Sequence, residues 1–457
     1  MELKPRFREM MEEAIGQERA RVAFSAFDSP ASCSVRLNPL KYSDSACLPE
    51  GEEVGWSVWG RILAGRPKFT LDPAFHSGGY YVQDSSSMFV GYVFREALKT
   101  ASVDGRMLKV LDLCAAPGGK TTDLAASLRE AVGENFILVS NEVMKQRAGV
   151  LADNVALWGD PNVVVTNDDP KAFSAMKGWF DLIVADVPCS GEGMFRKDEE
   201  AVAQWSEDNV ELCRTRQRRI IADVWDALAP RGIMIYSTCT FNRRENDENV
   251  RWIAETLGAE PILGGLPGSG VIRTEYGYSL VPGFVPGEGQ YCAALRKLSG
   301  PDWKCSSNLR QSKYKAVEDK ALAAKIKNYF TLPVVLKLKG ETVVALPENV
   351  AAEVAFADAF LHVIAAGTAV GAIKGKDLVP DADLALSVIL RDGAFPSVEV
   401  DRAAALKFLH RDSIVLSAVE KGYILLRYGS LGLGFVKNLG SRCNNLHPMS
   451  RRIRMDI

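Results

Sequence analysis

DLCAAPGGKTT, residues 112–122, joins the apolar run MLKVL to TTDLAASLRE, a stretch with the composition of a helix. A glycine turn between a strand and a helix lets the backbone approach a ligand, and the helix amino end favours an electronegative group. The Walker pattern of ATP-binding proteins requires glycine, four residues and then Gly-Lys-Ser/Thr. Residues 119–121 fit this pattern, but Cys114 occupies the position of the first glycine. Pro117 further weakens the ATP interpretation, because a phosphate-wrapping loop needs flexible backbone and free N–H groups.

Around this loop, short apolar runs alternate with helical patterns from about residue 107 to residue 298. Their β-branched, nearly continuous apolar character is typical of parallel strands that are covered on both faces. The alternation predicts an α/β fold with a doubly wound sheet, whose ligand site lies at the carboxyl ends of the strands. The runs are MLKVLDL (107–113), FILVSN (136–141), NVVVTN (162–167), DLIVADV (181–187) and GIMIYST (232–238).

Acidic side chains follow the second and third of these runs. Glu142 lies about 20 residues after the glycine loop, where folds that bind dinucleotides place the acid for the ribose hydroxyls. Asp168 and Asp169 follow the third run, where an adenine edge is expected, and both stay open for that contact. A Walker protein needs no ribose acid, and the GxGxxG of NAD-binding folds is missing. The set therefore favours S-adenosylmethionine (SAM) as the ligand.

Two cysteines follow the fourth and fifth runs, in ADVPCSGEGMFRK (185–197) and YSTCTFNRREN (236–246). Free cysteines are usually small buried hydrophobes, but polar loops at the ligand crevice favour a chemical role for Cys189 and Cys239. A thiolate that adds to C6 of cytosine turns the ring into an enamine, whose C5 can accept a methyl group. Asp186 is placed to stabilise the charge near N3. Cys189, or a water that it positions, can assist the later loss of the C5 proton.

CAAPGGKTT, ADVPCSGEGMFRK and YSTCTF, in this order, resemble the motifs of RNA cytosine-5 methyltransferases of the Sun or RsmB/RsmF type. RLNPLK (36–41) and YYVQDSSSM (80–88) add to the resemblance, which implies a Rossmann-like fold with a reversed last strand and SAM as the methyl donor. It also implies that Cys239 attacks C6 and that Cys189 helps to release the product. The implied SAM contacts are Cys114, Ala115, Ala116, Pro117, Gly118, Gly119, Lys120, Glu142, Asp186 and one of Asp168 and Asp169.

A rival assignment comes from DNA-type cytosine methylases, which attack with the cysteine of a PC motif, here Cys189. STCTF, and GEGMFRK after PCS, favour the RNA family instead. The resemblance implies ribosomal RNA or the small ribosomal subunit as the partner, with transfer RNA as an alternative substrate. The alternative of another class is an ATP-dependent RNA-binding protein built on a degenerate P-loop.

Four segments are expected along the 457 residues. The first, 1–100, resembles the RRM-like amino-terminal extension of the family and begins with a charged helix, Met1–Phe24. The SAM-dependent methyltransferase domain follows over 101–298, and a linker (299–313) opens a small intermediate region, 299–380. The β-rich end, 381–457, contains LGLGFVKNLGSRCNNLHP and resembles the PUA-like RNA-binding module of RsmF-type enzymes.

The composition limits how RNA could be bound. A total of 55 Lys and Arg against 57 Asp and Glu excludes a globally basic protein, so local clusters must bind the phosphates. Neither a disulfide framework nor a metal site is expected from nine scattered cysteines without a CxxC pair and four isolated histidines. The charged start and the short apolar run Ala359–Ile373 predict a cytoplasmic protein without a membrane span, and we expect a monomer. The candidate RNA contacts are Arg147, Arg196, Lys197 and Arg243.

Overall fold

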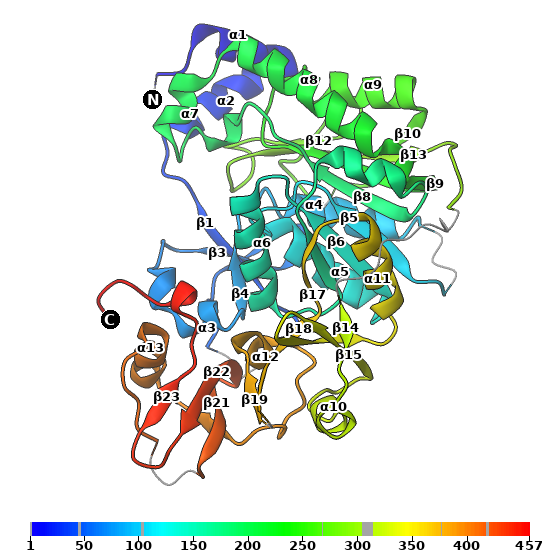
Figure 1. The fold of residues 1–457 in the computed structure, drawn as a ribbon. Coiled ribbons are helices and arrows are strands. Elements are labelled where there is room, and N and C mark those ends of the chain that lie inside the picture. The colour runs from blue at the N-terminus through cyan, green and yellow to red at the C-terminus, as the bar shows by residue number, and fades with distance from the viewer. Residues whose placement is uncertain are drawn as a thin grey trace.

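A large mixed sheet forms the centre of the computed structural model, which describes residues 2–43, 47–101, 105–266, 268–303, 314–375, 377–416 and 420–457. Most of the predicted linker lies outside these residues. The sheet order is β11-β12-β13-β9-β8-β5-β6-β7-β17, with β10 also paired to β13 (Figure 1). Its five parallel strands are the five predicted runs: β5 (Leu108–Asp112), β6 (Phe136–Asn141), β7 (Val163–Thr166), β8 (Phe180–Asp186) and β9 (Leu228–Thr238).

Antiparallel strands extend this sheet at both edges. β13 (Gln290–Lys297) runs antiparallel to β9, which confirms the reversed last strand. At the other edge, β17 (Val363–Ala366) runs antiparallel to β7, although the two strands are far apart in sequence. Three shorter strands complete the first edge: β10 (Ala259–Ile262), β11 (Ile272–Arg273) and β12 (Tyr278–Leu280).

Helices cover both faces of the sheet, as the continuous apolar runs predict. Neighbouring residues of one strand enter opposite cores: Val110 packs into the first core and Leu111 into the second, because side chains alternate along a strand. Helices α4 (Phe89–Leu98), α5 (Gly119–Val132) and α6 (Lys145–Trp158) form the first core with the sheet. The second core contains α8 (Glu207–Val224), α9 (Asp247–Leu257) and α11 (Ala351–Phe360).

The amino-terminal region combines two helices with a small antiparallel sheet. The single helix expected over Met1–Phe24 is wrong: α1 (Pro5–Ile15) and α2 (Gln17–Phe27) are separated at Gly16, whose φ of 86° interrupts a right-handed helix. The helices pack on Phe195 and on α7 (Glu199–Gln204). The sheet has the order β2-β3-β1-β4, formed by Glu52–Val54, Ser57–Leu63, Cys33–Leu37 and Tyr80–Val82, and α3 (Pro73–His76) precedes β4.

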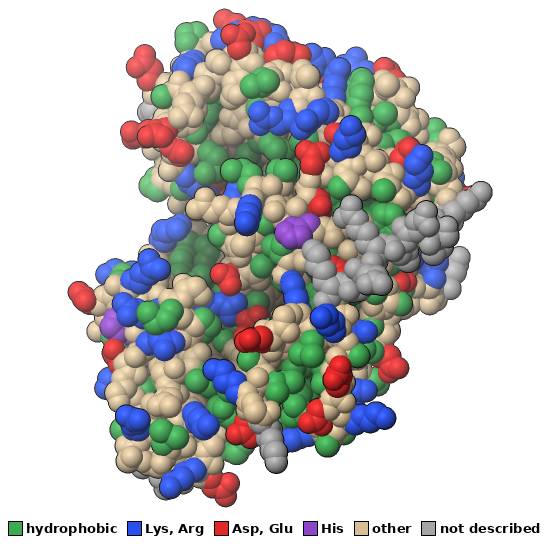
Figure 2. Space-filling view, viewed as in Figure 1, with side chains coloured by type: hydrophobic (Ala, Val, Ile, Leu, Met, Phe, Trp, Pro, Cys, Tyr) green, Lys and Arg blue, Asp and Glu red, His purple; other side chains and the backbone are tan. Residues whose placement is uncertain are grey.

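The carboxyl-terminal region contains two sheets, and the second lies in the segment 381–457 that is predicted to be β-rich. One sheet, β14-β15-β16-β18-β19, is formed by Lys315–Ala316, Val334–Lys339, Thr342–Pro347, Thr368–Lys374 and Asp377–Pro380, with α10 (Lys320–Lys327) beside it. The other, β20-β21-β22-β23, is formed by Ser397–Glu399, Gly422–Tyr428, Leu431–Asn438 and Cys443–Asn445, with α12 (Ala382–Leu386) and α13 (Arg402–His410). Figure 2 shows the molecular surface hollowed between this region and the amino-terminal helices. In the part of the chain that the structure describes, no helix is long and apolar enough to cross a membrane.

Candidate active site

The glycine loop lies between β5 and α5. Gly118 has a φ of 116°, which residues with a side chain rarely adopt, and α5 begins at Gly119. The N–H of Ala115 donates to the carbonyl oxygen of Asn141 at 2.8 Å, so the loop is fixed to the end of β6. Cys114 is half-buried in the loop, and its burial raises the pKa of the thiol. The loop and the amino end of α5 thus lie at the carboxyl edge of the sheet, where such folds bind ligands.

Asp112 ends β5 directly beneath this loop. Its Oδ2 accepts a hydrogen bond from Thr121 Oγ1 at 2.7 Å, and its buried Oδ1 has no hydrogen-bond partner among the described residues. Burial raises the pKa of this carboxyl to about 7, against the opposing effects of Thr121 and Lys120. A buried acid with an unused oxygen beneath a glycine turn fits a cofactor that carries positive charge and hydrogen-bond donors, as SAM does.

Glu142 and Arg147 connect β6 and α6 to the loop. Glu142 is buried, and its Oε2 lies 3.1 Å from Arg147 Nη1. Arg147 Nη2 donates to the carbonyl oxygen of Ala116 at 2.7 Å, and Asn154 Nδ2 donates to that of Pro117 at the same distance. Arg147, which the sequence suggests as an RNA contact, therefore links the acid predicted for the ribose to the glycine loop.

The two aspartates after β7 have different surroundings. Asp169 is exposed, and its side chain accepts from the N–H of Lys171, which caps a short 3-10 helix, η2 (Pro170–Ala175). Asp168 is half-buried, and its Oδ2 accepts from the N–H of His362 at 2.8 Å. Asn141 also donates to the backbone of Asp168 and accepts from it. Asp168 is thus fixed between the end of β6 and the start of β17.

Lys120 and Asp186 form an ion pair beside the cysteine loops, with Lys120 Nζ 2.7 Å from Asp186 Oδ2. The other carboxylate oxygen, Oδ1, accepts from Ser237 Oγ at 2.6 Å and from Gln290 Nε2 at 3.2 Å. Burial lowers the pKa of Lys120, but Asp186 and the nearby Cys239 raise it overall. Lys120 was predicted as a SAM contact, and the structure directs its ammonium group towards Asp186.

Cys189 and Cys239 meet where β8 and β9 end, with their Sγ atoms 3.3 Å apart. The hydrogen bond to Cys239, burial and the charge of Glu245 together raise the pKa of Cys189 well above its usual value. The two sulfur atoms are within hydrogen-bonding distance of each other, and either thiol can be the donor. The structure brings together the two cysteines that the sequence places in separate motifs.

Four polar residues around this site had no role in the sequence prediction. Ser237 and Gln290 orient Asp186, and the buried acids Glu192 and Glu245 connect the two cysteine loops. Ser237, Glu192 and Glu245 stand in the quoted motifs, so proximity to the cysteines is the signal that could have pointed to them. Gln290 lies on the reversed strand and carried no such signal.

Comparison with known proteins identifies the family. The model "16S rRNA methyltransferase RsmB/F" matches residues 101–293, "N-terminal domain of 16S rRNA methyltransferase RsmF" matches 3–85, and "Methyltransferase RsmF PUA domain" matches 395–453. Ribosomal RNA small subunit methyltransferase F of Shewanella loihica is 31% identical over 446 residues, which cover 92% of this chain and 89% of that protein. This chain belongs to the RsmF family. The predicted resemblance, the methyltransferase class and SAM as its cofactor are thereby confirmed, and the family is favoured over the P-loop alternative.

Two further similarities concern the family and the fold of this RsmF chain. The protein of the same name from Cronobacter sakazakii is 36% identical over 315 residues, or 64% of this chain, and the match spans 63% of that relative's length. A solved methyltransferase homolog from Pyrococcus horikoshii is 24% identical, has a TM-score of 0.52, and is covered completely by 65% of this chain. The solved structure supports the Rossmann-like fold of the RsmF core.

The other candidate RNA contacts of this RsmF chain differ in exposure. Arg196 is only 8% exposed, because it bonds Glu288 at 2.6 Å and the carbonyl oxygen of Gly287. Lys197 is 31% exposed and lies 3.1 Å from Asp84. Arg243 is 46% exposed and lies 3.6 Å from Glu275. Lys197 and Arg243 thus present more surface to a ligand than Arg196 does.

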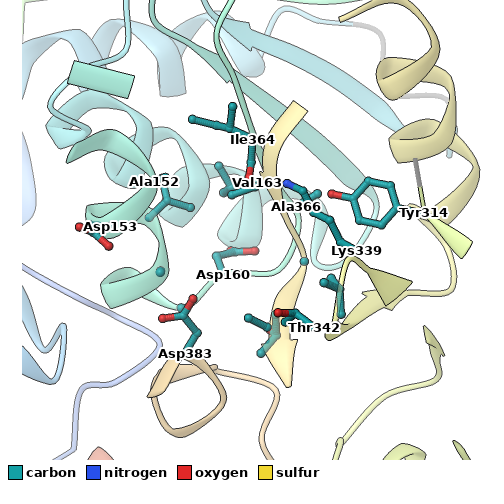
Figure 3. Close-up of a pocket in the computed structure, with 18 of the residues that line it drawn as sticks. Ala152, Asp153, Asp160, Val163, Tyr314, Lys339, Thr342, Ile364, Ala366 and Asp383 are labelled. Atoms are coloured by element: carbon teal, nitrogen blue, oxygen red, sulfur yellow. Dashed lines mark hydrogen bonds between the residues drawn. The ribbon is translucent and has the colours of Figure 1, made fainter. Parts of the chain in front are cut away.

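A separate cavity of about 390 Å³ lies at the opposite end of β7, between α6 and the first carboxyl-terminal sheet (Figure 3). Its acids are already paired: Arg451 lies 3.0 Å from Asp153 and 2.7 Å from Asp383, and Asp160 is bonded by Arg129 at 2.8 Å. The amino ends of parallel strands do not form the ligand crevice in such folds. In this RsmF chain the cavity therefore marks the junction between the central sheet and the carboxyl-terminal region. Among the described residues, no group of three or more His, Cys, Asp or Glu side chains is placed to hold a metal.

Proposed function

We propose that this RsmF chain is a SAM-dependent RNA (cytosine-5-)-methyltransferase that methylates a cytosine of small-subunit ribosomal RNA. The observation that carries the proposal is the pair of cysteines 3.3 Å apart beside the Lys120–Asp186 ion pair. Two cysteine side chains in contact next to a fixed acid suit addition to a pyrimidine ring followed by elimination.

In this mechanism Cys239 is the nucleophile and Cys189 the release residue. The Cys239 sulfur lies 3.3 Å from the Cys189 sulfur, and it adds as the nucleophile to C6 of the flipped base. Asp186 and Lys120 stabilise the charge that develops on the ring at the N3 edge. Bound SAM supplies the methyl group that C5 accepts. Cys189, or a water that it positions, then assists removal of the C5 proton, and the Cys239–C6 bond breaks.

The residues that would hold SAM surround the glycine loop. Residues 114–119 would approach the cofactor through their backbone, and Glu142 would bind the ribose hydroxyls. Of the two aspartates, Asp168 is our candidate for the adenine contact, because Asp169 caps η2. Asp112, which had no part in the sequence prediction, would face the charged end of the cofactor with its unpartnered oxygen.

For RNA, Lys197 and Arg243 are our candidates for phosphate contacts beside the cysteines. The negatively charged RNA backbone must pass close to the cysteines when the target base is flipped into the site, and these two side chains carry positive charge there. Arg147 and Arg196 would stabilise the site through contacts within the protein, with Ala116 and with Glu288, and would not contact RNA directly. The PUA-type region would bind structured RNA by shape and backbone. We place the enzyme in the cytoplasm as a monomer.

The test is site mapping of 5-methylcytosine by bisulfite sequencing. Purified protein and SAM are incubated separately with unmodified small-subunit ribosomal RNA, assembled small subunits and transfer RNA. Methylation of a defined cytosine in either ribosomal substrate is expected, with none by Cys239→Ala. Modification of transfer RNA alone would replace the ribosomal proposal, and SAM binding without any methylation would overturn the enzymatic one.

A further inference from the structure

Two buried glutamates connect the loops that carry the cysteines. Glu192 follows Cys189 in the first loop, and Glu245 follows Cys239 in the second. Both side chains are completely buried, and the proposed mechanism assigns neither of them a step. Buried acids are expensive to maintain and gather at functional sites. Their hydrogen-bond partners indicate a structural link between the two loops. Each carboxylate accepts hydrogen bonds from the loop that carries the other cysteine.

Glu245 holds the loop of Cys189. It accepts hydrogen bonds from the N–H of Ser190 at 3.0 Å, from Ser190 Oγ at 2.5 Å and from Gln217 Nε2 at 2.7 Å. Gln217 Nε2 also donates to the carbonyl oxygen of Pro188 at 3.0 Å. The residues on both sides of Cys189 are therefore fixed by one carboxylate and the amide that it binds.

Glu192 holds the loop of Cys239. Its Oε2 accepts from the N–H of Phe241 at 2.6 Å and from that of Asn242 at 3.2 Å. The N–H of Gly193 donates to the carbonyl oxygen of Cys239 itself at 2.7 Å. Asn242 Nδ2 then bridges the two acids, 2.9 Å from Glu192 and 2.9 Å from Glu245.

We infer that Glu245 and Glu192 are reciprocal positioning residues: Glu245 holds Cys189 in place for release, and Glu192 holds Cys239 in place for attack. The inference rests on the cysteine roles proposed above. Burial and the neighbouring Glu192 raise the pKa of Glu245 to about 7, so this arrangement is held against a desolvation penalty. Because the backbone N–H groups that each acid binds belong to the loop of one cysteine, loss of either acid should disturb one cysteine more than the other.

The first experiment measures the cysteine geometry without RNA or SAM. Oxidised glutathione converts the two thiols to a disulfide and is itself reduced to two glutathione molecules, which take up both protons. The sulfur atoms must then move from 3.3 Å to about 2.05 Å apart. We expect Glu245→Gln and Glu192→Gln to slow formation of the Cys189–Cys239 disulfide about tenfold, the effect of losing one charged hydrogen bond. Peptide mass spectrometry after alkylation gives the rate.

Two variants control this measurement. Glu248→Gln removes a half-buried carboxylate of the adjacent helix α9 that pairs with Arg214, and it should oxidise at the wild-type rate. Ser190→Ala leaves both buried acids in place and removes only one donor to Glu245, so it should slow the reaction less, in the same direction. It also keeps the test valid if Glu245→Gln does not fold. Wild-type rates in both Glu245→Gln and Ser190→Ala would overturn the inference.

The second experiment separates the two positioning roles by the covalent protein–RNA adduct. In Glu245→Gln the adduct should form, and it should then persist about tenfold longer than in wild type, as expected when Cys189 is missing. In Glu192→Gln the adduct should form more slowly. A purely structural effect would lower adduct formation equally in both variants and would contradict the inference. If Cys189→Ala itself accumulates no adduct while the disulfide rates behave as expected, the proposed release role fails and the positioning geometry stands.

Discussion

At the scale of single residues, burial changes the pKa of ionisable side chains in the site. Asp112 illustrates this, because burial raises its pKa to about 7 from an ordinary value of 3.8. An acid whose pKa is raised by folding contributes stability that is complete below pH 3.8 and is lost as the pH rises through 7. In the protein without cofactor, the loss is on the order of 2–4 kcal/mol.

Asp112→Asn keeps an acceptor for Thr121 and removes this titration. We expect the variant to gain thermal stability relative to wild type at pH 8 and to gain little or nothing at pH 4. Differential scanning fluorimetry of both proteins at the two pH values measures the change. An equal shift of the melting temperature at both pH values would show that Asp112 does not titrate as proposed.

The sequence could name the reactive residues of the site but not the residues that position them. Cys189, Cys239 and Asp186 follow predicted strands, and the parallel order of those strands brings their ends together. Glu192 and Glu245 act through cross-loop hydrogen bonds, which exist only once β8 and β9 are paired. Arg147 and Lys120 have charges that suit several partners, and only the folded geometry selects among them.

At the scale of elements, pattern predicts the central strands and fails at the sheet edges. The five parallel strands lie within the predicted runs, apart from small extensions, because strands buried on both faces must be apolar throughout. β17 is four residues long and pairs with a strand about 200 residues earlier, so no local pattern indicates its partner. The helix predicted over Met1–Phe24 has a continuous charged pattern, which does not reveal the break at Gly16.

The segment at the start of β17 makes an element-scale prediction about cofactor binding. His362→Pro removes the N–H that donates to Asp168, and His362→Ala keeps it. If Asp168 binds adenine, we expect the proline variant to bind SAM about tenfold more weakly, because one hydrogen bond that orients the acid is lost. The alanine variant should bind within about twofold of wild type, the range expected for an exposed side chain. Isothermal titration calorimetry measures the affinity of both variants for SAM. Equal affinities would contradict this role of the segment at the start of β17.

At the scale of the whole molecule, Arg451 connects the carboxyl-terminal region to the core. Its side chain is 14% exposed and joins Asp153 of α6 to Asp383 of α12. Arg451→Ala leaves two acids without their cation, and we expect faster amide exchange in α6, α12 and β22 together with a higher KM for RNA. SAM affinity should stay unchanged, since the junction lies at the far end of β7.

The exposed neighbour Arg452 supplies a matched control, because Arg452→Ala removes the same charge from the surface. Hydrogen exchange followed by mass spectrometry and steady-state kinetics would compare the two variants. The same exchange pattern in Arg451→Ala and Arg452→Ala would mean that the junction does not depend on the buried ion pairs.

The most direct test of the account compares covalent adducts between protein and small-subunit ribosomal RNA in the presence of SAM, using wild type, Cys239→Ala and Cys189→Ala. Denaturing gel electrophoresis separates the adduct from free protein. The account predicts that Cys189→Ala accumulates the adduct, that Cys239→Ala forms none and does not methylate, and that wild type shows little adduct because it completes release. Methylation by Cys239→Ala, with Cys189→Ala inactive and free of adduct, would reverse the roles and contradict the mechanism.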